Sequence, residues 1–501
     1  MLKNTDTSQK LKKKEYKSDI ITLGLRLSEM QRICKDESIP VTIIFEGWSA
    51  AGKGSRISSL IKYLDPRGFE VFTIQKTTED ERLRPFMWRF WQRAPAKGRF
   101  HIFDRSWYQA LMRGQDKHET LLADPVYDIK SFEKTSVDNG AVIIKLFLHV
   151  SKKEQKKRLR ALEDNSETAW RVSPADWYQN RHYKKTLSRF EHMLQDTDHN
   201  AAPWTVIEAN NSRFADIKVY KTVVSALEKA VKARQDKSAA INVKPENIKD
   251  TTNNNTNKSV KSTESSTLAN TDLTIAIGRE EYISRLRKAQ NELAALHNAM
   301  YKQRVPAAMV FEGWDAAGKG GAITRAVATL DPRGYKVAPF GAPNDIENAH
   351  HYLWRFWNEV PKAGHMTVFD RSWYGRVMVE RVEGFCKTAD WKRAFEEIND
   401  FEKQLTDSGI VLLKFWLHIS PEEQLKRFEL RTNTPEKAWK ITDEDWRNRE
   451  KWDQYLEAVD DMLRLTSTEY APWTIIEAVD KLYARVKVAE TAKNRLESAL
   501  E

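Results

Sequence analysis

Residues 307–334 read AAMVFEGWDAAGKGGAITRAVATLDPRG, and residues 41–68, which lie 266 positions earlier, read VTIIFEGWSAAGKGSRISSLIKYLDPRG. Each stretch runs from an apolar segment through a glycine-rich turn into an amphipathic segment, which predicts a strand, a phosphate-binding loop and a helix. The similarity continues along the chain: FDRSWY begins at Phe103 and again at Phe369, and APWTVIEA at Ala202 returns as APWTIIEA at Ala471. A period this long indicates two duplicated domains and not a solenoid.

The two repeats set the expected domain organisation. We predict an N-terminal repeat over residues 1–235, a flexible polar linker over residues 236–272 and a C-terminal repeat over residues 273–501. The linker contains KDTTNNNTNKSVKSTESSTLANT, a composition that cannot form an apolar core. In the second repeat, apolar runs at 305–311, 366–369, 410–419 and 473–477 alternate with helical patterns at 279–303, 319–330 and from Pro421. This alternation predicts an α/β fold with a parallel sheet flanked by helices.

The composition excludes several classes of protein. Of the 501 residues, 41% are hydrophobic and 31% are charged, which is typical of a soluble globular protein. The two cysteines, Cys34 and Cys386, cannot build a disulfide framework, so we expect a cytoplasmic protein. No apolar run approaches the ~20 residues of a membrane helix, and the first residues lack the apolar core of a signal peptide.

The charge is distributed unevenly. Residues 271–501 contain 34 Lys+Arg and 37 Asp+Glu, which leaves 48 and 34 for residues 1–270. The net charge is therefore −3 in the second part and +14 in the first. Such an excess indicates contact with a polyanion, and a solvated basic surface is an equally good interpretation. We expect neither nucleic acid nor a membrane as a partner.

The glycine-rich turn of the second repeat carries the strongest chemical signal. Gly313, Gly318 and Lys319 fit the pattern G-x-x-x-x-G-K between a strand and a helix, where backbone N–H groups and the lysine surround a phosphate. Gly320 follows the lysine where a Ser or Thr usually meets Mg²⁺. Asp315 lies inside the loop, where its carboxylate would bind Mg²⁺ or orient an attacking phosphate oxygen; loop capping is the alternative.

A second motif follows a later strand. Asp370 resembles a Walker B carboxylate that reaches the Mg²⁺ shell, so Asp315 and Asp370 are the expected metal ligands. Arg371, Arg376 and Arg381 follow it, and guanidinium groups bind phosphate through a bidentate fork. Each arginine could equally belong to a surface ion pair. We interpret His418 as a core histidine.

These motifs together resemble the polyphosphate kinase type 2 family, over both repeats and in its tandem branch of polyphosphate:AMP phosphotransferases. The residues that carry the resemblance are FEGWDAAGKGG, LDPRG, YLWRFW, FDRSWYGRVMVERVEG and LHIS. The resemblance implies two tandem P-loop kinase-like domains, each with a helical lid, which would lie between Leu417 and Trp473. It implies transfer of the terminal phosphate of polyphosphate to AMP, giving ADP, with Mg²⁺. Asp315, Lys319, Asp370 and Arg371 fall on the family's catalytic positions.

The first repeat departs from this pattern. Ser49 stands where the second repeat has Asp315, and QALMRGQDKH replaces GRVMVERVEG, so the counterparts of Arg376 and Arg381 are lost. Lys53, Asp104 and Arg105 remain. We therefore predict a degenerate site in a repeat that has a binding or structural role.

Other functions fit part of the sequence. An ATP-dependent nucleoside monophosphate kinase would use the same loop, Walker B carboxylate and lid, but Gly320 counts against it. ADP or GMP as the acceptor stays open, and so does the oligomeric state.

Overall fold

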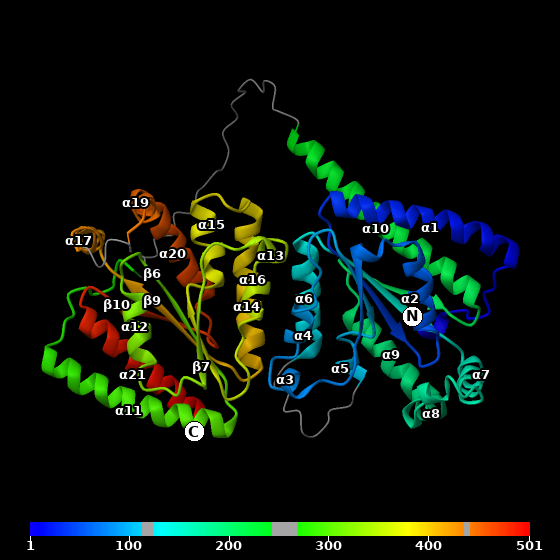
Figure 1. Cartoon of the computed structure of the whole chain (residues 1–501), viewed down its shortest axis with the longest axis horizontal. Helices are drawn as coiled ribbons and strands as arrows, with labels where there is room; N and C mark the ends of the chain where they lie inside the picture. Colours follow the sequence, from blue (N-terminus) through cyan, green and yellow to red (C-terminus); the bar gives the residue numbers. More distant parts are fainter. Residues whose placement is uncertain (113–123, 243–267, 435–440) are drawn as a thin grey trace, which may run out of the picture.

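The computed structural model describes residues 1–112, 124–242, 268–434 and 441–501. Two α/β units lie side by side, each with a five-stranded sheet flanked by helices (Figure 1). The predicted fold class is therefore confirmed. The centre of the predicted linker, residues 243–267, lies outside the described residues, as do residues 113–123 and 435–440. In the described part of the chain, no helix has the length and apolar character needed to cross a membrane.

The two sheets have the same all-parallel topology. The strand orders are β2-β3-β1-β4-β5 and β7-β8-β6-β9-β10, so the first strand of each unit is central. The first sheet contains β1 (Val41–Gly47), β2 (Phe69–Thr73), β3 (Phe100–Asp104), β4 (Val142–His149) and β5 (Trp204–Glu208). The second contains β6 (Ala307–Gly313), β7 (Tyr335–Pro339), β8 (Met366–Asp370), β9 (Val411–His418) and β10 (Trp473–Glu477). Ala307 pairs with both Met366 and Val411, which aligns the strand ends that carry the two motifs.

The helices follow the same duplication. The N-terminal unit contains α1 (Lys13–Asp36), α2 (Lys53–Leu60), α3 (Glu79–Arg82), α4 (Trp88–Trp91), α5 (Gln109–Met112), α6 (Pro125–Asp138), α7 (Lys152–Glu163), α8 (Pro174–Arg181), α9 (Tyr183–Thr197) and α10 (Ser212–Asn242). The C-terminal unit contains α11 (Arg279–Gln303), α12 (Lys319–Ala326), α13 (Asp345–Asn348), α14 (Trp354–Trp357), α15 (Val379–Val382), α16 (Thr388–Asp407), α17 (Pro421–Thr432), α19 (Asp443–Glu450), α20 (Trp452–Thr466) and α21 (Lys481–Leu500).

The two units meet through equivalent surfaces. The N–H of Lys97 donates to the carbonyl of Ala349 at 2.8 Å, and the N–H of Ala363 donates to the carbonyl of Leu83 at 2.7 Å. Lys97 and Ala363 are equivalent positions of the two repeats, as are Leu83 and Ala349. The helices α6 and α16 also face each other across this boundary (Figure 1). The chain thus reproduces within itself the two-fold contact of a symmetric dimer.

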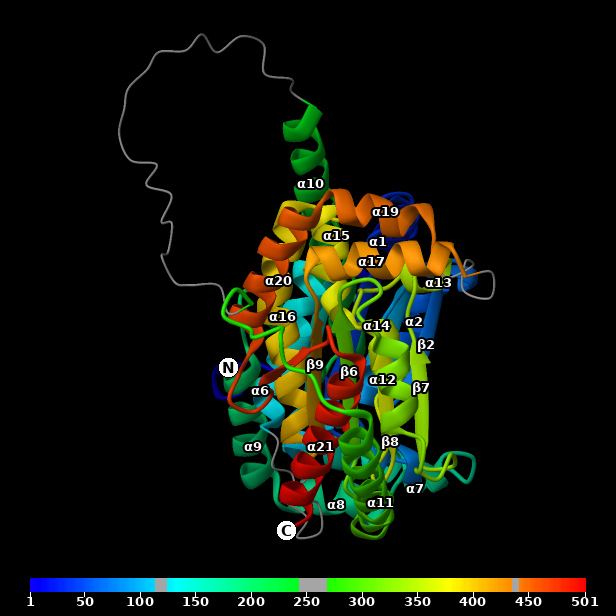
Figure 2. The ribbon, with the colours of Figure 1, turned by 90° about the vertical axis from the view of Figure 1, so that its left-hand side faces the viewer.

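Helices α17 and α19, which belong to the segment expected to form the lid, lie at the opposite end of the molecule from their counterparts in the first unit, and all four are called lid helices below. Helices α17 and α19 stand at one end of Figure 1, and their counterparts α7 and α8 stand at the other. In Figure 2, α17 and α19 cross above the strands of the second sheet. This edge of the second sheet is where the sequence motifs converge.

Candidate functional site

The phosphate-binding loop of the second unit joins β6 to α12. Gly313 has φ +152°, and a Cβ there would lie 2.6 Å from the carbonyl oxygen of Leu417, so only glycine fits. Gly318 has φ +109° and forms the N-cap of α12. Gly320 lies in the first turn of that helix. The glycines of the motif therefore let β6 pack beside β9 and turn directly into a helix N-terminus, where backbone N–H groups favour an anion.

An arginine of the lid holds this loop in place. In Arg427, one guanidinium nitrogen donates to the carbonyls of Ala316 and Ala317, at 3.0 and 3.1 Å. The other donates at 2.8 Å to the carbonyls of Ala478 and Val479, just after β10. Arg427 was not predicted from the sequence. It could have been found by aligning the two repeats, because Arg158 stands at the equivalent position and donates to carbonyls of the first unit in the same way.

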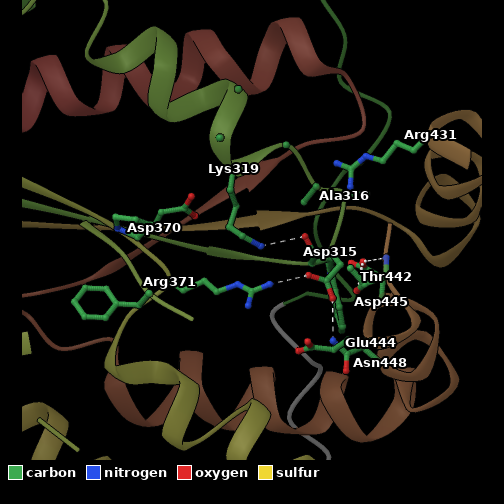
Figure 3. A pocket seen from close by; sticks show the side chains of 17 residues that line it. Asp315, Ala316, Lys319, Asp370, Arg371, Arg431, Thr442, Glu444, Asp445 and Asn448 are labelled. Atoms are coloured by element: carbon green, nitrogen blue, oxygen red, sulfur yellow. Dashed lines mark hydrogen bonds and ion pairs between the residues drawn. The ribbon is translucent and has the colours of Figure 1, made fainter. Parts of the chain in front are cut away.

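A cavity of about 550 Å³ opens beside the loop (Figure 3). The loop and α12 form one wall, the ends of β7 and β8 form another, and the lid forms the third. The lining residues are Trp314, Asp315, Ala316, Ala317, Gly318, Lys319, Gly320, Gly321, Pro339, Phe340, Asp370, Arg371, Arg431, Thr442, Glu444, Asp445 and Asn448. Gly313 lines a narrower adjacent cavity. The structure therefore brings Asp315, Lys319, Asp370 and Arg371 together, as predicted.

The charged groups of the cavity converge on the loop carboxylate. Arg371 places a guanidinium nitrogen 3.6 Å from Oδ1 of Asp315, and Asn448 of α19 donates to Oδ2 at 3.1 Å. The ammonium of Lys319 donates to the carbonyl of Gly313 at 2.6 Å. Figure 3 shows Lys319 and Arg371 reaching from the same side toward Asp315. Two cations that line one polar cavity suit a bound phosphate group.

The two predicted metal ligands are compatible with Mg²⁺. Asp315 and Asp370 line the same cavity, from the loop and from the end of β8. Among the described residues, no group of three or more His, Cys, Asp or Glu side chains is arranged to hold a metal. Mg²⁺ usually binds one or two carboxylates and completes its shell with water and substrate phosphates. The donor set thus fits an ion that enters with a phosphorylated substrate.

Two predicted phosphate ligands do not line this cavity. Arg376 pairs with Glu380 at 2.9 Å, and Arg381 pairs with Glu457 and Asp461 at 2.7 and 2.8 Å. These contacts fasten α15 to its neighbours, so the structure does not bring the three predicted guanidinium groups together.

Arg431 lines the cavity instead, and it reaches it from α17. It lies inside the charge-rich lid segment of the sequence, but nothing in the local pattern separates it from its neighbours.

His418 occupies the core position that the sequence indicated. Its Nδ1 accepts a 3.0 Å hydrogen bond from Nε1 of the buried Trp314. Burial lowers the pKa of His418 to about 4, so the ring is neutral at physiological pH. The histidine therefore orients the first residue after Gly313 and does not line the main cavity.

The first unit has the same loop, but the residue equivalent to Asp315 is Ser49. Lys53 donates to the carbonyls of Gly47 and Trp48, as Lys319 does to their counterparts. The N–H of Ser49, however, donates at 2.8 Å to the side chain of Gln179 in α8. Asp104 ends β3 and Arg105 follows it, at the positions of Asp370 and Arg371. The phosphate-binding loop of the first unit thus lacks a carboxylate, and one of its backbone N–H groups already donates to a side chain of α8.

Comparisons with known proteins agree with these features. The family model for polyphosphate kinase 2 matches residues 10–235 and 276–501. The polyphosphate:AMP phosphotransferase of Pseudomonas syringae pv. tomato is 42% identical over 463 residues, 92% of this chain and 90% of that protein. Its namesake from Pseudomonas aeruginosa is 40% identical over 504 residues, 100% of this chain and 99% of that protein.

A solved structure has the same architecture along the whole chain. The structure described as "polyphosphate kinase 2 from Pseudomonas aeruginosa PA01" covers 100% of this chain and 99% of its own, with a TM-score of 0.83 and 37% sequence identity. Both units, the tandem arrangement and the loop chemistry lead to the same assignment. The chain belongs to the polyphosphate kinase 2 family.

Proposed function

We propose that the C-terminal unit transfers the terminal phosphate of inorganic polyphosphate to AMP and releases ADP. The observation that carries this proposal is that two unlike cavities share residues. The large cavity is polar and charged, whereas the narrower one beside it exposes mostly apolar surface, to which Trp416, Trp452 and Val459 contribute. Both include Asp315, Lys319 and Arg371. A polyanion and a nucleoside would thus approach the same three charged groups from two sides.

A third cavity supports a polymeric donor. It has a volume of about 180 Å³ and lies on the other side of Gly318, between α12, α17 and α21. Arg427, Arg431, Lys481 and Arg485 give it a strongly basic lining. Arg431 lines this cavity as well as the main one. A chain of phosphates that ends at Lys319 would be long enough to extend into this basic cavity. A nucleoside triphosphate is too short to require such a site.

The reaction assigns a role to each charged group. A phosphate oxygen of AMP forms a bond to the terminal phosphorus of the chain, while the bond from that phosphorus to the bridging oxygen breaks. The shortened polyphosphate leaves with the electron pair. Lys319 and Arg371 balance the charge on the transferred group, and Asp315 orients the acceptor phosphate. Asp315 and Asp370 would hold Mg²⁺, which would supply neutralisation of phosphate charge.

The competing function is an ATP-dependent nucleoside monophosphate kinase. Gly320 lacks the hydroxyl with which a Ser or Thr at this position usually binds Mg²⁺. The test incubates the full chain with AMP and Mg²⁺ and adds either polyphosphate or ATP. We expect ADP from polyphosphate, with little from ATP. Faster formation of ADP with ATP would favour the competing function, and ADP or GMP offered in place of AMP tests the acceptor.

A further inference from the structure

The turn after β8 holds a residue in an unusual conformation. Arg371 has φ +66°, a left-handed backbone that L-residues with a side chain rarely adopt. Its N–H donates to the carbonyl of Phe311 at 3.1 Å, which fixes the turn to β6. Such a conformation persists only where the surroundings over-determine it. The residues that follow Arg371 show what does so.

Two buried carboxylates hold the next three residues. Ser372 donates from Oγ to Oε1 of Glu312 at 2.8 Å. Trp373 and Tyr374 donate from Nε1 and Oη to Oε1 of Glu402, at 3.0 and 2.5 Å. Each of the three residues after Arg371 thus donates from its side chain to one of two carboxylates, Glu312 of β6 or Glu402 of α16.

The second of these carboxylates belongs to a closed network. Lys414 of β9 donates to Oε2 of Glu402 at 2.7 Å, to Oη of Tyr374 at 2.9 Å and to the carbonyl of Thr466 at 2.7 Å. The side chains of Lys414 and Glu402 are both 0% exposed. All three N–H groups of the ammonium have acceptors, and the hydroxyl of Tyr374 both donates and accepts. A fully satisfied network of this kind is rigid.

We propose that Tyr374, Glu402 and Lys414 are positioning residues that hold the Arg371 turn and thereby aim Asp370 and Arg371 at the reacting phosphates. None of the three lines any of the three cavities around the loop. This inference rests on the proposed function, because it assigns a role in the same reaction. A buried ion pair does not necessarily increase the stability of a protein. Stability alone is therefore a weak explanation for the buried pair of Lys414 and Glu402.

The first unit supplies a matched control. Tyr108, Glu133 and Lys145 form a corresponding network, with Tyr108 and Trp107 donating to Glu133 and with Lys145 at 2.9 Å from it. It differs from the second network in that His199 also contacts Glu133, at 2.8 Å. Arg105 has φ +64° in the equivalent turn. That unit has Ser49 where the second unit has Asp315. Replacing the tyrosine by phenylalanine therefore removes a buried hydrogen bond to a glutamate in both units, but only the second unit also has the loop carboxylate Asp315.

The experiment compares Tyr374→Phe with Tyr108→Phe in the full chain, using short polyphosphate and AMP. We expect similar decreases in melting temperature. We expect Tyr374→Phe alone to lower kcat, by about tenfold to a hundredfold, with KM changed by less than about threefold. An unchanged kcat in Tyr374→Phe overturns the proposal, and so does an equal loss of kcat in Tyr108→Phe. Failure of the wild-type protein to form ADP would instead remove the proposed function, and the inference with it.

A second pair of variants keeps the test decisive if Tyr374→Phe does not fold. Glu402→Gln with Lys414→Met removes both charges but keeps an acceptor oxygen for Trp373 and Tyr374. Glu402→Ala with Lys414→Met removes that oxygen as well. Because Lys414 is lost in both, we expect both to lower kcat, and the second to lower it about tenfold further than the first. Equal kcat values in the two double variants would overturn the proposal.

Discussion

The side-chain amide of Asn448 donates a 3.1 Å hydrogen bond to Oδ2 of Asp315, which joins lid helix α19 to the phosphate-binding loop. The carbonyl oxygen of the same amide accepts from Oη of Tyr455 at 3.3 Å, so its nitrogen faces the loop. One carboxylate oxygen of Asp315 is thereby engaged by the lid, and the other faces Arg371. The lid and the turn after β8 thus orient the same carboxylate.

Replacing this carboxylate tests its role in turnover. Asp315→Asn keeps the shape of the side chain but removes the charge that orients the acceptor and binds Mg²⁺. We expect kcat to fall by about 10²–10³, the usual effect of losing one oriented electrostatic contact. Steady-state rates with AMP and short polyphosphate measure it. The control is Ser49→Ala at the equivalent position, which should leave kcat nearly unchanged; near-wild-type kcat in Asp315→Asn would contradict the assignment.

The loop lysine distinguishes chemistry at the chain end from binding along the chain. Lys319→Ala removes the ammonium beside Gly313, at which the terminal phosphate would be held. Turnover should therefore fall with long and short polyphosphate alike. KM and kcat measured for defined chain lengths check this expectation. If short chains were spared, Lys319 would bind the remainder of the chain and not the reacting phosphate.

The basic surface of the first unit offers a contrasting test. The residues Lys152, Lys153, Lys156, Lys157 and Arg160 are exposed on α7. This helix lies at the end of the molecule opposite α17 and α19 (Figure 1). A polyanion held there would raise the local donor concentration only for chains long enough to reach the other end.

Replacing the four lysines by Gln should therefore raise KM for long polyphosphate, weaken its salt dependence and leave short chains unaffected. An unchanged KM for polyphosphate at every chain length would show that α7 does not bind the donor, and that the first unit only packs against the second. Lys62 and Lys221 are charged side chains outside α7, and their replacement by Gln provides a control of similar chemistry.

The boundary between the units contains a buried carboxyl that makes stability depend on pH. Asp128 of α6 is 3% exposed, and burial raises its pKa to about 7, reinforced by Asp407, Asp124 and Asp400 and opposed by Lys403. Because the folded-state pKa lies above the ordinary value of 3.8, this group favours folding below pH 4. That contribution is lost as the pH rises through 7.

Asp128→Asn should consequently stabilise the protein at pH 8, by on the order of 2 kcal/mol, and stabilise it by less at pH 5, because the contribution of this carboxyl falls progressively between pH 4 and 7. Thermal unfolding at several pH values measures the difference. A variant equally stable relative to wild type at both pH values would show that Asp128 does not titrate in this range.

The sequence predicted the elements that local pattern determines. Strand β10 and helix α11 begin and end at the predicted residues, because each is an isolated apolar or amphipathic segment with clear ends. Strand β7 was not predicted: it is an edge strand with several exposed side chains that ends at Pro339, so its residues show no continuous apolar run. The other edge strand, β10, was predicted because its residues form a continuous apolar run.

The site divides in the same way. Asp315, Lys319, Asp370 and Arg371 were predicted because each lies in or beside a recognisable motif, at the end of a strand or in the loop that follows it. Arg381 was misplaced because its partners, Glu457 and Asp461, are contributed by α20. Contacts over such a separation depend on how the lid packs, which no local pattern encodes. The fold of each unit was therefore predictable, whereas the surroundings of the loop were not.

Two equivalent backbone hydrogen bonds, from Lys97 to Ala349 and from Ala363 to Leu83, join the two halves of the boundary. Both halves belong to one chain, and this affects how substitutions in them are inherited. In an assembly of two identical chains, every substitution is expressed in both halves at once. Here each half of the boundary has its own codons, so a change in one half is not copied to the other. One half can therefore lose its loop carboxylate, as Ser49 shows, while the other keeps Asp315. Joining the halves in one chain makes asymmetry between them heritable.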